Sequence, residues 1–203
     1  MSATTPLCDI AFKYGTDKCP QLKHAYTPYY YEIFKDKQKT VNKVLELGIG
    51  HYKGMDKNEW VFDPGLNRNY HRGASLYMWR DFFPNALIYG ADRVPEAIFQ
   101  DQRIATILVD ERNKSDLENL IRQTGSDIDI FIDDASHKVS DQIFAARVLL
   151  PLLNDNITYI IEDVGRTKEI MNSLGDLYNY HIPPIPRKWK GGMLLVITKK
   201  KTA

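Results

Sequence analysis

The chain has 203 residues, of which 43% are hydrophobic, and this length suits one domain with a full α/β core. Its 27 basic and 26 acidic side chains give a net charge of +1, which argues against a nucleic-acid or anionic-membrane partner. No stretch reaches the roughly 20 apolar residues that span a bilayer, and the N-terminus lacks a signal-peptide pattern. Cys8 and Cys19 fit neither a disulfide framework nor a zinc site. We therefore expect a soluble, cytoplasmic protein.

Residues 1–40 precede the first convincing strand and are expected to form an N-terminal helical arm. Residues 14–18, Y-G-T-D-K, are typical of a turn. Residues 24–34 favour a helix whose first turn accommodates Pro28 and whose aromatic side chains pack on the domain.

Residues 43–50, K-V-L-E-L-G-I-G, predict a buried strand that runs into a glycine turn. Gly48 and Gly50 would let a ligand approach the backbone closely, although a lone G-x-G is a weak signal. Glu46 lies inside the apolar strand and needs a partner if it is buried, which favours a polar role beneath the glycine turn.

Residues 51–72 are rich in turn formers and aromatics and show no sustained period, which predicts a long insertion loop beside the ligand crevice. We expect this loop to act as a flap on the acceptor side, because Tyr52, Trp60, Phe62 and Tyr70 could stack on sugar or aromatic rings. An inert surface excursion is the competing interpretation. A helix is expected from residue 73 until Pro84.

Strands and helices alternate along the rest of the chain, which predicts an α/β fold with a mostly parallel sheet. Two of the expected strands each end on a single acid, one on Asp92 and the other on Asp110. The last two strands, joined by a proline-rich connection, predict an antiparallel hairpin at the sheet edge. The remaining expected strands are 86–92, 104–110, 127–133, 157–163, 178–182 and 193–198, and the expected helices are 115–124, 139–153 and 169–174.

Two strands end on pairs of acids. Residues 127–137, D-I-D-I-F-I-D-D-A-S-H, place Asp133, Asp134 and His137 just beyond a buried strand, and residues 157–163 end on Glu162 and Asp163. In open α/β sheets, ligands bind outside the carboxyl ends of the strands. If the two strands are neighbours, four carboxylates and a histidine converge, and a bound cation would relieve their repulsion.

These motifs together resemble class I S-adenosylmethionine-dependent methyltransferases, and more closely the macrocin O-methyltransferase family, which methylates sugars of natural products. The resemblance spans nearly the whole chain: Y-G-T-D-K with H-A-Y-T-P-Y-Y, V-L-E-L-G-I-G, G-A-S-L-Y-M-W-R-D-F-F-P-N-A, Y-G-A-D, F-I-D-D-A-S-H and Y-I-I-E-D-V. It implies one methyltransferase domain over residues 1–203, with a Rossmann-like seven-stranded sheet, helices on both faces and an antiparallel last strand.

The resemblance also implies the site. His137 would be the general base, and Asp134, Glu162 and Asp163 would hold Mg²⁺ or Mn²⁺. S-adenosylmethionine would lie over the glycine turn, with an acid on its ribose. The residues implied in cofactor binding are Glu46, Gly48, Gly50, Ser75, Asp92, Asp110, Asp133, Tyr14 and Thr27.

The leading hypothesis is therefore a metal-dependent O-methyltransferase acting on a hydroxyl of a small acceptor, a sugar or glycosylated metabolite. A non-catalytic cofactor-binding subunit with the same fold is the alternative from another class. An NAD-linked oxidoreductase is disfavoured, because the dinucleotide fingerprint would need glycine where Lys53 stands. The two Tyr/Lys pairs, near residues 14–18 and 31–35, lie upstream of the sheet. Assembly into a homo-oligomer is left open.

Overall fold

The computed structural model describes residues 4–50, 60–63, 68–186 and 192–201. One eight-stranded sheet, ordered β5-β6-β4-β1-β7-β8-β10-β9, forms its centre. Five central strands are parallel, β10 runs antiparallel to β8 and β9, and β5 runs antiparallel to β6. The strands are β1 (Lys43–Leu47), β4 (Leu87–Asp92), β5 (Gln100–Asp101), β6 (Ile104–Leu108), β7 (Ile130–Asp133), β8 (Thr158–Ile161), β9 (Tyr178–His181) and β10 (Leu195–Lys199).

The expected α/β class and the antiparallel hairpin at the edge are confirmed. The described sheet has eight strands instead of the seven expected. The additional strand is the two-residue β5, which pairs with β6. A segment this short carries no alternating pattern in the sequence, so only its pairing reveals it.

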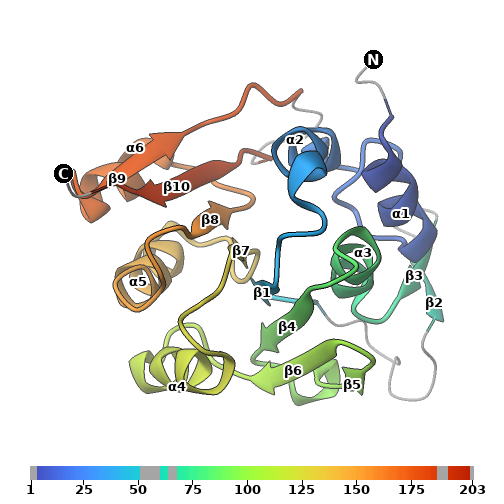
Figure 1. The fold of residues 1–203 in the computed structure, drawn as a ribbon, viewed down its shortest axis with the longest axis horizontal. Helices are drawn as coiled ribbons and strands as arrows, with labels where there is room; N and C mark the ends of the chain where they lie inside the picture. Colours follow the sequence, from blue (N-terminus) through green and yellow to red (C-terminus); the bar gives the residue numbers. More distant parts are fainter. Residues whose placement is uncertain (1–3, 51–59, 64–67, 187–191, 202–203) are drawn as a thin grey trace.

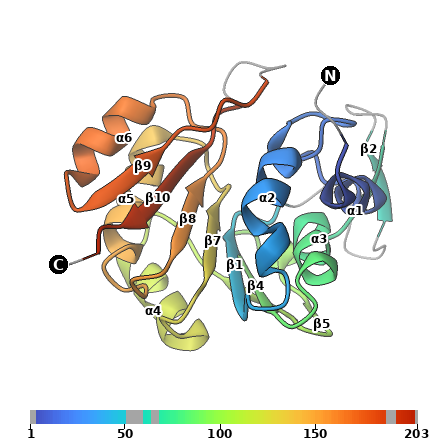
Figure 2. The same ribbon diagram turned by 45° about the horizontal axis from the view of Figure 1, so that its top comes forward.

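Helices cover both faces of the sheet (Figures 1 and 2). The hydrophobic cluster on one face joins strand residues such as Val44 and Ile132 to α1, α2 and α3. The cluster on the other face joins Leu45 and Phe131 to α4, α5 and α6. Successive strand residues therefore point into different cores, as expected for a sheet buried on both faces. The helices are α1 (Pro6–Tyr14), α2 (Tyr26–Phe34), α3 (Ala74–Phe82), α4 (Lys114–Thr124), α5 (Val139–Leu149) and α6 (Thr167–Leu174).

Local signals explain several helix ends. The Asn113 side chain accepts a hydrogen bond from the Ser115 backbone N–H and caps α4, which ends at Gly125, as the sequence predicts. Helix α1 lies within the expected N-terminal helical arm, although its bounds were not predicted. Thr5 caps it, and Gly15, at φ 76°, ends it in the left-handed conformation. None of the described helices is long and apolar enough to cross a membrane.

The expected insertion loop contains a two-stranded antiparallel hairpin, β2 (Trp60–Asp63) and β3 (Arg68–His71). The lack of a sustained period in residues 51–72 gave no indication of these two strands. In Figure 1 the hairpin lies beside α1, and the carbonyl of Asn69 approaches Gly15 so closely that a Cβ there would overlap it. Tyr52 and the rest of residues 51–59 and 64–67 lie outside the described residues, so the predicted flap remains a prediction.

The parallel strands end level with one another. Leu47 of β1 pairs with Ala91 of β4 and with Asp133 of β7, and Asp133 pairs with Ile161 of β8. The two strands that end on acid pairs are thus neighbours, as the convergence of the acids requires. Their polar side chains gather at the carboxyl edge of the sheet.

Candidate active site

A cavity of about 280 Å³ opens at this edge, where the glycine turn after β1 meets the turn after β7. Gly48, at φ 86°, lies so close to the β7 turn that a Cβ would be 2.3 Å from the Asp134 carbonyl oxygen. A glycine is therefore needed for the two turns to approach. The cavity is lined by Thr16, Asp17, Lys18, Lys23, His24, Glu46, Gly48, Ile49, Gly50, Tyr70, Ser75, Asp134, Ala135, His137, Glu162 and Asp163.

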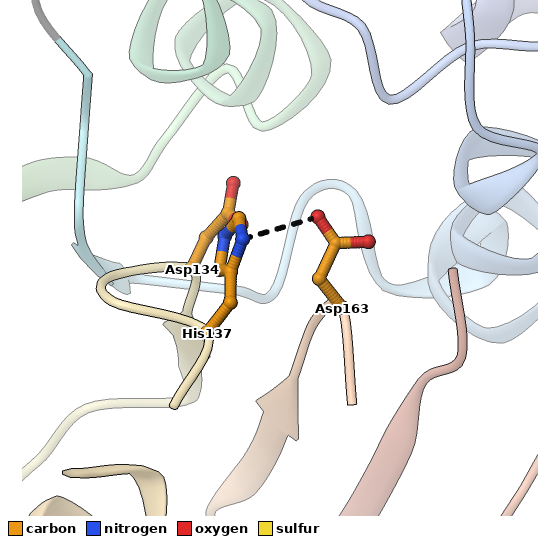
Figure 3. A group of neighbouring side chains, drawn as sticks. All are labelled: Asp134, His137 and Asp163. Atoms are coloured by element: carbon orange, nitrogen blue, oxygen red, sulfur yellow. Dashed lines mark hydrogen bonds and ion pairs between the residues drawn. The ribbon is translucent and has the colours of Figure 1, made fainter. Parts of the chain in front are cut away.

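Asp134, His137 and Asp163 face one another in this cavity (Figure 3). The Nε2 atom of His137 lies 3.0 Å from Asp134 Oδ1, and its Nδ1 atom lies 3.7 Å from Asp163 Oδ2. Each residue offers one potential ligand atom, and these three atoms lie within 4.8 Å of one another. The set has the size and chemistry of a cation site.

Backbone strain accompanies this cluster. His137 and Asp163 adopt φ values of 56° and 50°, a region that residues with a Cβ rarely occupy. Such strain persists only where the surrounding structure fixes it, and it concentrates at functional sites.

Glu162 is buried beside the cluster, and both of its oxygens are hydrogen-bonded. Tyr30 donates from its hydroxyl to Oε1 at 2.6 Å, and Lys18 donates from Nζ to Oε2 at 2.6 Å. Lys18 Nζ also lies 2.6 Å from Asp134 Oδ2 and 3.4 Å from Glu46 Oε1. The predicted ligand Glu162 therefore lies at the site, but its oxygens already have partners within the chain.

Glu46, the acid inside β1, has a hydrogen-bond partner at one carboxylate oxygen and an ion-pair partner at the other. The indole N–H of Trp79 in α3 donates to Glu46 Oε2 at 2.8 Å, and Lys18 faces its other oxygen. Ser75, one turn earlier in α3, lines the same cavity. The glycine turn, α3 and the N-terminal arm therefore meet around this carboxylate.

The Lys18 ammonium forms ion pairs with three carboxylates, and these contacts shift the pKa values of the groups involved. Burial alone would lower the pKa of Lys18, but Asp134, Glu162 and Glu46 outweigh it and hold that pKa well above its usual value. Burial raises the pKa values of Glu46 and Glu162. Burial would also raise the pKa of Asp134, but Lys18 and His137 lower it to about 2. The hydrogen bond with Asp134 in turn raises the pKa of His137.

The N-terminal arm supplies the donors that complete the site, which the sequence analysis missed. Lys18 reaches the acids from the turn before α2, and α2 supplies Tyr30 to Glu162 and Tyr26 to Asp163 Oδ1 at 2.6 Å. His24 is also buried, stacked on Tyr26 with ring centroids 4.7 Å apart. The sequence offered one signal, the density of tyrosines in residues 26–31, whereas the burial of Lys18 does not follow from any local pattern.

The predicted cofactor residues Asp92 and Gly50 lie in an adjoining cavity of about 130 Å³ that shares Gly48 with the first. Asp92 Oδ2 accepts hydrogen bonds from the backbone N–H groups of Ile49 and Gly50, both at 3.1 Å. It thereby fixes the glycine turn. Glu111 also lines this cavity, a residue that the sequence analysis did not select.

Four predicted cofactor residues lie elsewhere. Asp110 forms a bidentate pair with Arg112 at 2.8 Å, while its neighbour Glu111 faces the cavity. Asp133 is the last residue of β7 and is buried, two positions from Phe131 and so on the face of the α4–α6 core. Tyr14 donates to Asp81 at 2.6 Å, and the Thr27 hydroxyl lies 3.1 Å from Cys8 Sγ. Neither Tyr14 nor Thr27 lines either cavity.

Comparisons with known proteins show which family the chain belongs to. The chain is 34% identical over 158 residues to mycinamicin VI 2''-O-methyltransferase of Micromonospora griseorubida, a match that covers 78% of this chain and 36% of the relative. It is 33% identical over 163 residues to demethylmacrocin O-methyltransferase of Streptomyces fradiae, covering 80% of this chain and 37% of the relative. The chain is a homologue of sugar O-methyltransferases. No family model matches it.

The structure matches the MycE methyltransferase of the mycinamycin biosynthetic pathway, solved in complex with Mg and SAH. The TM-score is 0.75 at 27% identity, and the match covers 98% of this chain and 55% of that one. The Rossmann-like methyltransferase fold is therefore confirmed. The chain spans little more than a third of the length of the curated relatives it matches.

Proposed function

We propose that this chain is an S-adenosylmethionine-dependent O-methyltransferase domain that acts on a hydroxyl of a glycosylated small molecule. The observation that carries the proposal is the cluster of Asp134, His137 and Asp163 beside the glycine turn at the carboxyl ends of the parallel strands. A relative acts at the same kind of group: its name, mycinamicin VI 2''-O-methyltransferase, describes methylation of a hydroxyl oxygen.

Each part of the cavity has a role in this proposal. The glycine turn, Ser75 and the second cavity beside Asp92 would hold the cofactor, whose sulfonium supplies the methyl group. A sugar hydroxyl is a weak acid and a poor nucleophile at neutral pH. His137, which Asp134 orients and which stays partly exposed, would accept its proton as the methyl group is transferred.

The donor set fits a hard divalent ion. Asp134 and Asp163 each offer a carboxylate oxygen, and these two oxygens lie within 4.8 Å of each other; oxygen ligands suit Mg²⁺ or Mn²⁺ better than zinc. When bound, such an ion supplies positive charge that makes a nearby hydroxyl more acidic. We propose Asp134 and Asp163 as its principal ligands, with Glu162 joining when one of its hydrogen-bond donors moves away.

The first test is cofactor binding. Calorimetry with S-adenosylmethionine, S-adenosylhomocysteine, NAD and NADP should detect binding of the first two and no binding of the nicotinamide cofactors. The reason is that the turn after β1 lacks the third glycine of the dinucleotide fingerprint, with Lys53 in its place. Tighter binding of NAD or NADP would refute the methyltransferase proposal.

The second test is metal removal. Exhaustive chelation should abolish methyl transfer to a panel of glycosylated polyketides, and Mg²⁺ or Mn²⁺ should restore it. Asp134→Asn should weaken Mn²⁺ binding by about tenfold or more, because it removes one of the two proposed carboxylate ligands, while S-adenosylhomocysteine affinity should change little. Full turnover after chelation would remove the ion from the mechanism.

A further inference from the structure

Lys18 occupies the position in the acidic site where a cation is needed. Its side chain is 2% exposed, and its ammonium group lies 2.6 Å from carboxylate oxygens of both Asp134 and Glu162. A lysine is rarely buried this completely unless its charge is paired. Four acids, Glu46, Asp134, Glu162 and Asp163, line this cavity. The Lys18 ammonium already relieves part of the repulsion between their carboxylates.

The backbone holds Lys18 in this position. The carbonyl of Lys18 accepts hydrogen bonds from the N–H groups of Tyr26 and Thr27, both at 3.1 Å, at the start of α2. The lysine stem therefore enters the cavity from a fixed point, and the ammonium reaches acids that lie 116 and 144 residues further along the chain. An exposed lysine with alternative rotamers would not make two such short contacts at once.

A divalent ion and the Lys18 ammonium would draw on the same oxygens. Asp134 turns Oδ2 to Lys18 and Oδ1 to His137, so an ion at the Asp134–Asp163 cluster would lie one carboxylate away from the ammonium. Glu162 can bind the ion through Oε2 only if Lys18 gives up that atom. Positive charges this close repel each other, even with the screening found near a protein surface.

We infer that Lys18 is a built-in cation of this site, which competes with the divalent ion for Asp134 and Glu162 and thereby limits the affinity of the site for metal. This inference rests on the proposed function, because it assumes that the acidic cluster binds a divalent ion. Lys18 acts through the carboxylates and is a positioning residue, and it takes no part in methyl transfer. Its effect should appear in metal binding and in stability, without any acceptor.

The test compares wild type with Lys18→Met, which keeps an unbranched side chain one atom shorter and removes its charge, and with Lys35→Met as the matched control. Lys35 pairs with Glu32 on the surface of the arm, 3.0 Å away, and does not line the cavity. Mn²⁺ alone is titrated into each protein by calorimetry, and melting temperatures are recorded with chelator and with excess Mn²⁺.

Lys18→Met should bind Mn²⁺ about tenfold more tightly than wild type, since the nearest competing charge is gone. With chelator its melting temperature should fall by several degrees, because the variant leaves buried carboxylates without their cation. Excess Mn²⁺ should recover most of this loss, because an ion that binds the folded state stabilises it. Lys35→Met should match wild type in both measurements. An Mn²⁺ affinity of Lys18→Met that is equal to or below that of wild type overturns the inference.

The double variant Lys18→Met/Glu162→Gln keeps the inference testable if Lys18→Met does not fold. Removing both charges of the pair should restore folding, and Asp134 should then bind Mn²⁺ at least as tightly as in wild type. A double variant that also fails to fold, or that binds Mn²⁺ more weakly than wild type, overturns the inference.

The two proposals fail in different ways. If wild type binds Mn²⁺ and Lys18→Met binds it no more tightly, only the role of Lys18 is refuted. If neither binds Mn²⁺, the proposed metal site and the competition fail together, while S-adenosylhomocysteine binding still decides the methyltransferase proposal.

Discussion

Replacing His137 with alanine is expected to slow methyl transfer by about 10²–10⁴-fold, the range typical of a lost general base. The imidazole is the group best placed to accept a proton, because Asp134 holds its Nε2 atom at 3.0 Å while the side chain remains 45% exposed. S-adenosylhomocysteine affinity should not change, since the proposed cofactor site comprises the glycine turn, Ser75 and the second cavity beside Asp92, which His137 does not line. The measurements are the rate of methyl transfer to an acceptor that wild type methylates and the affinity for S-adenosylhomocysteine by calorimetry.

Two further variants separate the roles that His137 could have. His137→Gln can still hydrogen-bond to Asp134 but cannot take up a proton at neutral pH, so it should be as slow as the alanine variant. Recovery of activity by glutamine would show that His137 only positions its neighbours. Mn²⁺ affinity should be nearly unchanged in both variants, and a large loss would instead make His137 a metal ligand. His181→Ala, an exposed histidine at the end of β9, serves as the control and should be fully active.

The arrangement of the strands was predictable because it follows from local patterns and one general rule. Apolar runs ending on acids predicted β7 and β8, and the parallel sheet brings Asp134 and Glu162 to the same edge as Gly48. The rule that ligands bind at the carboxyl ends of strands then located the cavity. Asp92 was selected on the same ground and does line the adjoining cavity.

The partners of these acids were not predictable in the same way. Lys18 belongs to a segment whose composition indicates only a turn, and its contact with Glu162 spans 144 residues of sequence. Tyr26 and Tyr30 fit the apolar stripe of α2, but a buried tyrosine also needs a partner for its hydroxyl. Which acid supplies that partner depends on how the arm docks, and this is set by tertiary packing. The same limit applies to Tyr14, whose hydroxyl donates to Asp81; the cofactor role that the resemblance implies for it stays a prediction.

Replacing Gly48 with alanine is expected to lower the free energy of unfolding by roughly 3 kcal/mol or more. Two costs combine at this position. The backbone is at φ 86°, where a Cβ is strained, and the new methyl group would lie 2.3 Å from the Asp134 carbonyl oxygen and 2.5 Å from Ala135 Cα. Because these atoms are backbone, the turn after β7 would have to move, and Asp134 would move with it.

Two other glycines of the chain separate the two costs. Gly50 also has a positive φ, of 73°, but among the described residues a Cβ there would meet only the Tyr70 hydroxyl, at 3.5 Å. Gly50→Ala should therefore lose about 1–2 kcal/mol, mainly from strain. No atom of the described part of the chain lies within 4 Å of a Cβ added at Gly165, and Gly165→Ala should stay within about 0.5 kcal/mol of wild type. Denaturant unfolding of the three variants should therefore give losses in the order Gly48, Gly50, Gly165. Equal losses at Gly48 and Gly50 would mean that the β1 and β7 turns are not in contact in solution, and the close approach on which the site depends would have to be abandoned.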